Sequence, residues 1–222
     1  MFSGFDEQFF AFLKELKAHN TREWFADNKS RYLADVETPA LDFITALAPA
    51  LKAISPRFMA RPMRMGGSLF RIHRDTRFSP DKTPFKTHIA MRFPHDGKDV
   101  ERPPSFYLHL APGDCAGGGG LYHTDMPALR KIRARINDVP KEWQAVRESG
   151  FEILGDQLKR VPLGYANDHA FAADLKRKDY YAFDTFTIDE VSSPDFVDRY
   201  AAECRQIAPL VQFLCASLDL KY

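Results

Sequence analysis

The chain of 222 residues contains few cysteines and no long apolar run. Its three cysteines, Cys115, Cys204 and Cys215, are an odd number without a CxxC pair, which argues against a disulfide framework and a cysteine-based zinc site. No window is apolar over the length needed to span a bilayer, and an acidic pair stands near the N-terminus where a signal peptide carries positive charge. We therefore expect a soluble, cytoplasmic protein without a membrane partner.

Motifs that identify common enzyme classes are also missing. The chain has no nucleophile elbow, no GxxxxGK[ST] phosphate loop and no Rossmann GxGxxG sequence. The glycines at 117–120 lead into LYHT and not into a phosphate-binding helix, so we interpret them as a bulge or turn. The sequence thus identifies no cofactor, and it leaves open whether the protein is an enzyme and what its oligomeric state is.

Net charge is small, at +1, but positive charge is concentrated in residues 69–88, LFRIHRDTRFSPDKTPFKTH. This segment, called the basic segment below, has a net charge of +3, and the rest of the chain sums to −2. Charge of one sign gathered locally is typical of a site for an anionic ligand. The five cations of the segment are Arg71, Arg74, Arg77, Lys82 and Lys86.

Hydrophobic periodicity changes twice along the chain. Helical spacing predicts N-terminal helices within residues 5–54 and C-terminal helices within 126–149 and 194–218. Between them, alternation with a period of two predicts a meander of about four strands. These lie at residues 67–73, 88–93, 105–110 and, more weakly, 118–124. The order indicates an α+β fold: one domain over 1–222, with a central, mainly antiparallel sheet flanked by N-terminal and C-terminal helices.

Such a sheet has one polar face and one apolar face. We expect the apolar face, with Phe70, Ile72, Ile89, Met91, Phe106 and Leu108, to pack on the helices. We expect the polar face to gather six side chains that are distant in sequence. These are Arg71, His73, His88, Arg92, Tyr107 and His109.

Resemblance to a known family covers nearly the whole chain. The segments RIHRDTRFSPDKTPFKTH, GGGLYH, LKRVPLGYANDH and LKRKDYYAF, together with the opening FLKELKAHNTREWFADNKSRY, resemble the blocks of the family called domain of unknown function 2461. The chain departs from that pattern at His73 and Phe85, where the family leads us to expect tyrosine. The resemblance implies a soluble single domain found in bacteria and names no reaction.

Our main interpretation is a binding site on the polar sheet face for a small molecule that bears a phosphate or carboxylate. Arginines offer bidentate donors to such groups, and lysines add mobile charge. The expected ligand-binding residues are Arg71, Arg74, Arg77, Lys82, Lys86, His88, Arg92 and Tyr107. The competing interpretation is that the pairs Arg74–Asp75 and Asp81–Lys82 belong to a salt-bridge network that only fixes a long loop.

Two other functions remain as alternatives. A hydrolase or transferase would use His73 or His109 as general acid or base, Asp75 to orient it, and arginines to stabilise developing charge. A nucleic-acid-binding module would combine the basic segment with stacking rings, although a pI of about 7.7 disfavours it. A metal site built on the histidines is disfavoured because neighbouring arginines would repel a divalent cation, so we predict no metal ligands.

Overall fold

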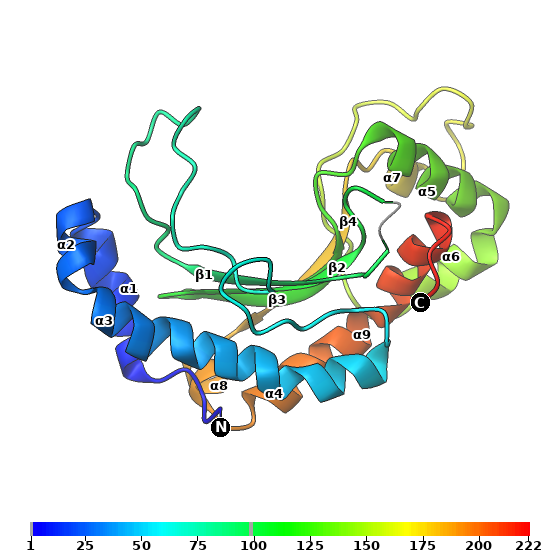
Figure 1. Ribbon diagram of the computed structural model, residues 1–222. Helices are drawn as coiled ribbons and strands as arrows, with labels where there is room; N and C mark the ends of the chain where they lie inside the picture. The colour runs from blue at the N-terminus through cyan, green and yellow to red at the C-terminus, as the bar shows by residue number, and fades with distance from the viewer. Residues whose placement is uncertain (1, 98–99) are drawn as a thin grey trace.

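The computed structural model describes residues 2–97 and 100–222, which form an α+β fold (Figure 1). The N-terminal helical region consists of α1 (Glu7–Ala18), α2 (Arg22–Asp27), α3 (Lys29–Arg31), the π-helical turn η1 (Tyr32–Glu37) and α4 (Thr38–Ile54). The strands are β1 (Ile89–Pro94), β2 (Ser105–Ala111), β3 (Asp114–Leu121) and β4 (Tyr180–Phe186). The remaining helices are α5 (Met126–Asp138), α6 (Pro140–Arg147), α7 (Ala172–Leu175), α8 (Ile188–Ser192) and α9 (Phe196–Ser217). The expected α+β class, with an antiparallel sheet between N-terminal and C-terminal helices, is confirmed.

Side-chain caps fix where several helices begin. The Asp6 carboxylate accepts a hydrogen bond from the Phe9 N–H at the start of α1, and the Thr21 hydroxyl accepts one from the Trp24 N–H at the start of α2. Thr187 and Glu190 form a reciprocal capping box at the start of α8. No helix of the described residues is both long and apolar enough to cross a membrane.

The four strands are antiparallel neighbours in the order β1-β2-β3-β4. Their registers place Arg92 opposite Tyr107, Tyr107 opposite Gly118, and Gly118 opposite Phe183. Side chains of facing residues in neighbouring strands project to the same side of a sheet. One row across the sheet therefore carries Arg92, Tyr107 and Phe183, with a glycine in its middle.

Two expectations about the strands were wrong. Residues 67–73 form no regular strand: they contact β1 through the single bridge between Leu69 and Met91, and His73 then pairs with Phe85. Burial in this segment does not follow the alternation of its sequence, because Ser68 and Leu69 are both buried and Phe70 is 40% exposed. The sheet is completed instead by β4, a strand that was not expected. The glycines at 117–120, expected in a bulge or turn, belong to β3.

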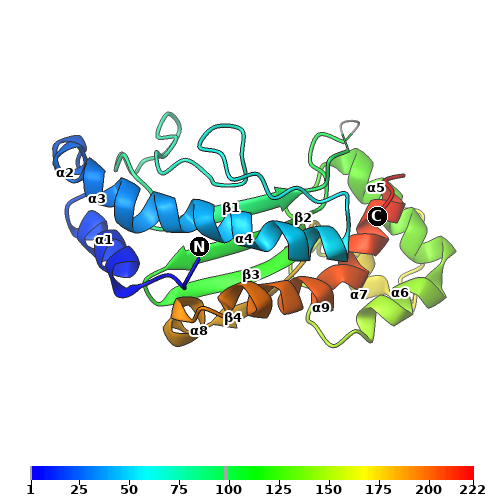
Figure 2. The same ribbon diagram turned by 60° about the horizontal axis from the view of Figure 1, so that its bottom comes forward.

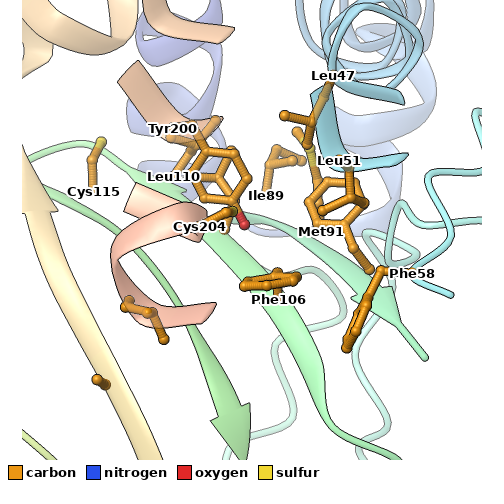
Figure 3. Close-up of a cluster of buried hydrophobic side chains, with 14 of the residues drawn as sticks. Leu47, Leu51, Phe58, Ile89, Met91, Phe106, Leu110, Cys115, Tyr200 and Cys204 are labelled. Atoms are coloured by element: carbon orange, nitrogen blue, oxygen red, sulfur yellow. The ribbon is translucent and has the colours of Figure 1, made fainter. Parts of the chain in front are cut away.

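Helices α4 and α9 cover one face of the sheet and lie side by side across it (Figure 2). Their apolar side chains meet those of β1 and β2 in a continuous core. Figure 3 shows its centre, where Leu47 and Leu51 of α4 and Tyr200 of α9 lie close to Met91 and Phe106. The buried face thus carries Ile89, Met91, Phe106 and Leu108, as expected, whereas Phe70 lies outside it.

Glycines in β3 allow α9 to approach the sheet closely. A Cβ at Gly117 would lie 2.7 Å from Cε2 of Tyr200, and a Cβ at Gly119 would lie 3.1 Å from Cγ2 of Val211. Real Cβ atoms do not tolerate the shorter of these contacts, so a side chain at 117 would push the helix away. The middle of the opposite face of the sheet is not covered by any helix of the described residues (Figure 1).

Candidate functional site

A cavity of about 660 Å³ lies on this second face of the sheet. We call it the arginine cavity; its characteristic side chains are two arginines, Arg92 and Arg102, and five aromatic residues, Phe70, Tyr107, Tyr122, Tyr181 and Phe183. The volume is within the range of about 300–1,000 Å³ that is usual for small-molecule sites. The lining comes from all four strands, from the basic segment and from residues that flank β2 and β3.

Arg92 is the best-positioned cation of the cavity. Its Nε donates a hydrogen bond to Oγ of Ser105 at 3.1 Å, and its Nη2 donates one to the carbonyl oxygen of Pro103 at 2.9 Å. Burial, and secondarily the nearby charge of Arg102, lower the pKa of Arg92. In the part of the chain that the structure describes, no carboxylate forms a salt bridge with Arg92. The guanidinium is therefore held in place by neutral oxygens, with its charge uncompensated.

Aromatic rings form the rest of the lining. The rings of Tyr107 on β2 and Phe183 on β4 are stacked, with centroids 5.8 Å apart, although β3 lies between the two strands. They meet because Gly118, which lies between them, has no side chain: a Cβ there would lie 2.2 Å from Cδ1 of Phe183. Tyr181 packs against Phe183 and Tyr122, with centroids 5.2 and 5.5 Å away. The result is a connected aromatic surface.

A second cavity, of about 400 Å³, lies near the other end of β2. We call it the histidine cavity; it is lined by His88, His109 and Asp114 together with Thr87 and with Lys14 and Lys17 of α1. The ring centroids of His88 and His109 are 4.5 Å apart, and Nε2 of His109 lies 3.5 Å from Oδ2 of Asp114. Burial lowers the pKa of both imidazoles, that of His88 to about 4, while Asp114 opposes this effect.

The structure brings together only some of the predicted site residues. Arg92 and Tyr107 line the arginine cavity, and His88 and His109 line the histidine cavity. Tyr107 and His109 are two positions apart on β2, so the cavities are neighbours on one sheet face about 7 Å apart along the strand.

Two of the five cations of the basic segment, Arg74 and Arg77, form ion pairs within the segment itself. Arg74 binds the Asp81 carboxylate and the Thr83 hydroxyl, and Arg77 Nη2 lies 2.7 Å from Oδ2 of Asp75. Hydrogen bonds from these arginines are the main reason that the pKa values of Asp75 and Asp81 fall to about 2. The expected loop network therefore exists, although Arg74 pairs with Asp81 and not with its sequence neighbour Asp75.

The other predicted site residues of the basic segment do not converge on one cavity either. Lys82 donates a hydrogen bond to the carbonyl oxygen of Thr76, and Arg71 is exposed. Burial, and secondarily the nearby charge of Arg71, lower the pKa of the Lys86 amine. Lys86 Nζ lies 5.2 Å from the centroid of the Phe70 ring, at the edge of the arginine cavity. His73 packs against Phe85, 5.1 Å between ring centroids, and so lies in neither cavity.

Sequence reasoning missed several residues that complete the two cavities. Tyr181 and Phe183 belong to β4, which was not expected, and Arg102 and Tyr122 lie beside the strands. Asp114, not Asp75, is the carboxylate beside His109. The signal that could have found Tyr181 and Phe183 is the alternation of YYAF in residues 180–183. Across the described ranges, no group of three or more His, Cys, Asp or Glu side chains is arranged to hold a metal ion.

Fold and cavities together define an α+β protein with two ligand-sized cavities on the face of an antiparallel sheet opposite α4 and α9, the second of them bordered by α1. A family model described as conserved hypothetical protein (DUF2461) matches residues 8–213. The chain belongs to this family, which confirms the resemblance seen in the sequence. Searches of curated proteins and of solved structures gave no match.

Proposed function

We propose that the protein binds a small molecule in which a planar aromatic ring is joined to a phosphate or carboxylate group, and that the arginine cavity is the binding site. The observation that carries this proposal is the uncompensated charge of Arg92 on the floor of a cavity lined by aromatic rings. A half-buried arginine without a carboxylate partner gains most from an anionic ligand, because the ligand supplies the counter-charge that the fold does not.

The shape of the guanidinium supports a phosphate or carboxylate over a simple halide. Nε and Nη2 of Arg92 are engaged by Ser105 and Pro103, so the group is oriented before a ligand arrives, and Nη1 has no hydrogen bond to a described residue. Arg102, whose Nη1 donates to the carbonyl oxygen of His123, adds a second charge to the same cavity. Two guanidinium groups favour a ligand group with two or three oxygens.

The aromatic surface supports a planar ring as the other half of the ligand. Phe70 and Phe183 remain about two-fifths exposed, and Tyr122 is 61% exposed, although large rings are usually buried. Exposed rings that gather around a cavity gain by stacking on a flat ligand.

The free and buried cysteines, Cys115, Cys204 and Cys215, further support a reducing bacterial cytoplasm as the place where the protein works.

The test is a binding screen with ligand pairs that differ only in charge. We would titrate the protein with phenyl phosphate, an aromatic carboxylate and a nucleoside monophosphate, each beside its uncharged counterpart, and measure melting temperature and calorimetric affinity. We expect the anionic member of at least one pair to bind. The variant Arg92→Met should weaken that binding by about tenfold or more and leave the uncharged counterpart unaffected, since one charge-assisted contact is worth roughly 1.5–3 kcal/mol.

Arg130→Met is the matched control, because Arg130 is an exposed arginine of α5 outside the cavity. The proposal fails if no anionic aromatic compound binds, or if Arg92→Met and Arg130→Met bind the anion equally well. A single-stranded oligonucleotide belongs in the same screen. If it bound more tightly than every mononucleotide, with a steep salt dependence, the ligand would be a nucleic acid and not a small molecule.

A further inference from the structure

The histidine cavity has the charge and the donors of a separate anion site. Lys14 and Lys17 are exposed, lie one turn apart on α1 and line the cavity from one side. Neither lysine has a salt bridge with a carboxylate of the described residues. The imidazoles of His88 and His109 line the cavity as well, and Thr87 adds a hydroxyl.

The only carboxylate that lines the cavity among the described residues is Asp114, whose side chain is 74% exposed. It lies beside His109, on β3, and not within ion-pair distance of either lysine. With both imidazoles neutral the cavity therefore carries one net positive charge, and with both protonated it would carry three. A bound dianion would therefore bring the net charge of the occupied cavity to between −1 and +1.

We propose that the histidine cavity is a second binding site, for a tetrahedral oxyanion such as a phosphate ester or a sulfate group. Lys14 and Lys17 hold the oxyanion from α1, and His88 and His109 donate hydrogen bonds to it from the sheet. This site does not depend on the proposed ligand of the arginine cavity, because the two cavities share no lining residue.

Binding at this site takes up protons. The charged groups around the imidazoles are Lys14 and Lys17 of α1, Lys86 before β1, and Asp114 of β3. Burial is the main cause that lowers the pKa of both imidazoles, and the neighbouring charges of His109 and Lys86 lower that of His88 further, so the free protein favours the neutral form of both rings. A bound dianion reverses the local field and favours the protonated rings, so affinity must rise as the pH falls.

Sulfate is the appropriate probe, because it stays a dianion over the whole pH range and any pH dependence then belongs to the protein. We would titrate sulfate into the full chain and follow the imidazole resonances by nuclear magnetic resonance, assigning them with His88→Gln and His109→Gln. We expect saturable shifts of the His88 and His109 resonances without shifts of those of His95 and His169, which lie elsewhere. Affinity should increase about fivefold or more between about pH 7.5 and 5.5.

The double variant Lys14→Met and Lys17→Met should weaken sulfate binding about tenfold or more at either pH. Its matched control is Lys52→Met with Lys159→Met, which removes two exposed lysines outside the cavity. Equal weakening in both double variants would overturn the proposal, because it would show attraction by overall charge alone. An affinity independent of pH, or shifts that do not saturate, would overturn it as well.

Discussion

Replacing Asp174 with alanine should be one of the most destabilising single substitutions in this protein. The Asp174 side chain is only 6% exposed, and its Oδ2 accepts a hydrogen bond from Nε1 of Trp143 at 2.9 Å. Its Oδ1 accepts one from Nε of Arg177 at 3.2 Å, and Nε of Arg147 lies 3.7 Å from Oδ2. Asp174 thus joins α6 and α7 to the segment that leads into β4.

The expected cost follows from what the substitution leaves behind. Trp143 is fully buried, so its indole N–H would lose its acceptor without access to water, at about 1–3 kcal/mol. Arg177 is 8% exposed and would keep a buried charge without its partner, and breaking such a pair costs roughly 3–5 kcal/mol. Because these losses overlap, we expect Asp174→Ala to lower the free energy of unfolding by about 4 kcal/mol. For a chain of this length, that corresponds to a melting temperature lower by roughly 8–16 °C.

Urea unfolding followed by far-ultraviolet circular dichroism measures this cost independently of the Trp143 fluorescence, which the substitution itself perturbs. Asp174→Asn should be intermediate, because the amide oxygen still accepts from one donor while its NH₂ group faces a guanidinium. Asp184→Ala is the control: Asp184 is 54% exposed, 3.3 Å from Nη2 of Arg199, and a surface pair is worth at most about 1 kcal/mol. Equal costs for Asp174→Ala and Asp184→Ala would refute the reasoning.

Two other substitutions test the sheet and the histidine cavity. Gly117→Ala should lower the free energy of unfolding by about 1–3 kcal/mol in urea titrations, because the new Cβ would lie 2.7 Å from Cε2 of Tyr200 and 2.8 Å from Cε2 of Phe186. An unchanged free energy of unfolding would contradict the steric explanation. His88 has its pKa lowered to about 4, below its value near 6.5 in an unfolded chain, so the unfolded state binds more protons and stability falls as the pH decreases through this window. Melting temperatures between about pH 7 and 4 should therefore fall less steeply for His88→Gln than for the natural chain, and parallel curves would contradict this assignment.

Local periodicity was enough to predict most of the fold. The apolar faces of α1, α4 and α9 and the alternation in β1 and β2 are properties of short segments, and short segments determine them. β4 is different, because it pairs with β3 across a connection that contains three helices. The local sequence of β4 does not indicate which strand it pairs with. Residues 67–73 show the reverse: their alternation resembles that of a strand, but the chain leaves β1 after Leu69 to pair His73 with Phe85.

The same distinction explains which site residues could be predicted. Arg92, Tyr107, His88 and His109 were placed on one face by their parity along antiparallel strands, and the structure puts them on one face. The basic segment was expected to deliver its charges to that face, but ionic attraction acts at short range, and carboxylates within the same loop are nearer than the sheet. A local excess of charge therefore identified the segment without showing where its charges point.

The four glycines of β3 show why the core and the cavities depend on each other. Gly117 and Gly119 face the helices, where a side chain would collide with Tyr200 or Phe106, so the sheet and α9 can approach closely only if both lack one. Gly118 faces the other way and lets Tyr107 and Phe183 stack across it, and Gly120, with φ of +137°, lines the arginine cavity. Glycine weakens a strand, because it loses more conformational freedom on folding than other residues. Close packing of α9 can offset that cost for the two inward positions only. A Cβ at Gly118 would lie 1.9 Å from the carbonyl oxygen of Ala182 and 2.2 Å from Cδ1 of Phe183, so the glycine there permits both the close approach of β4 and the aromatic surface.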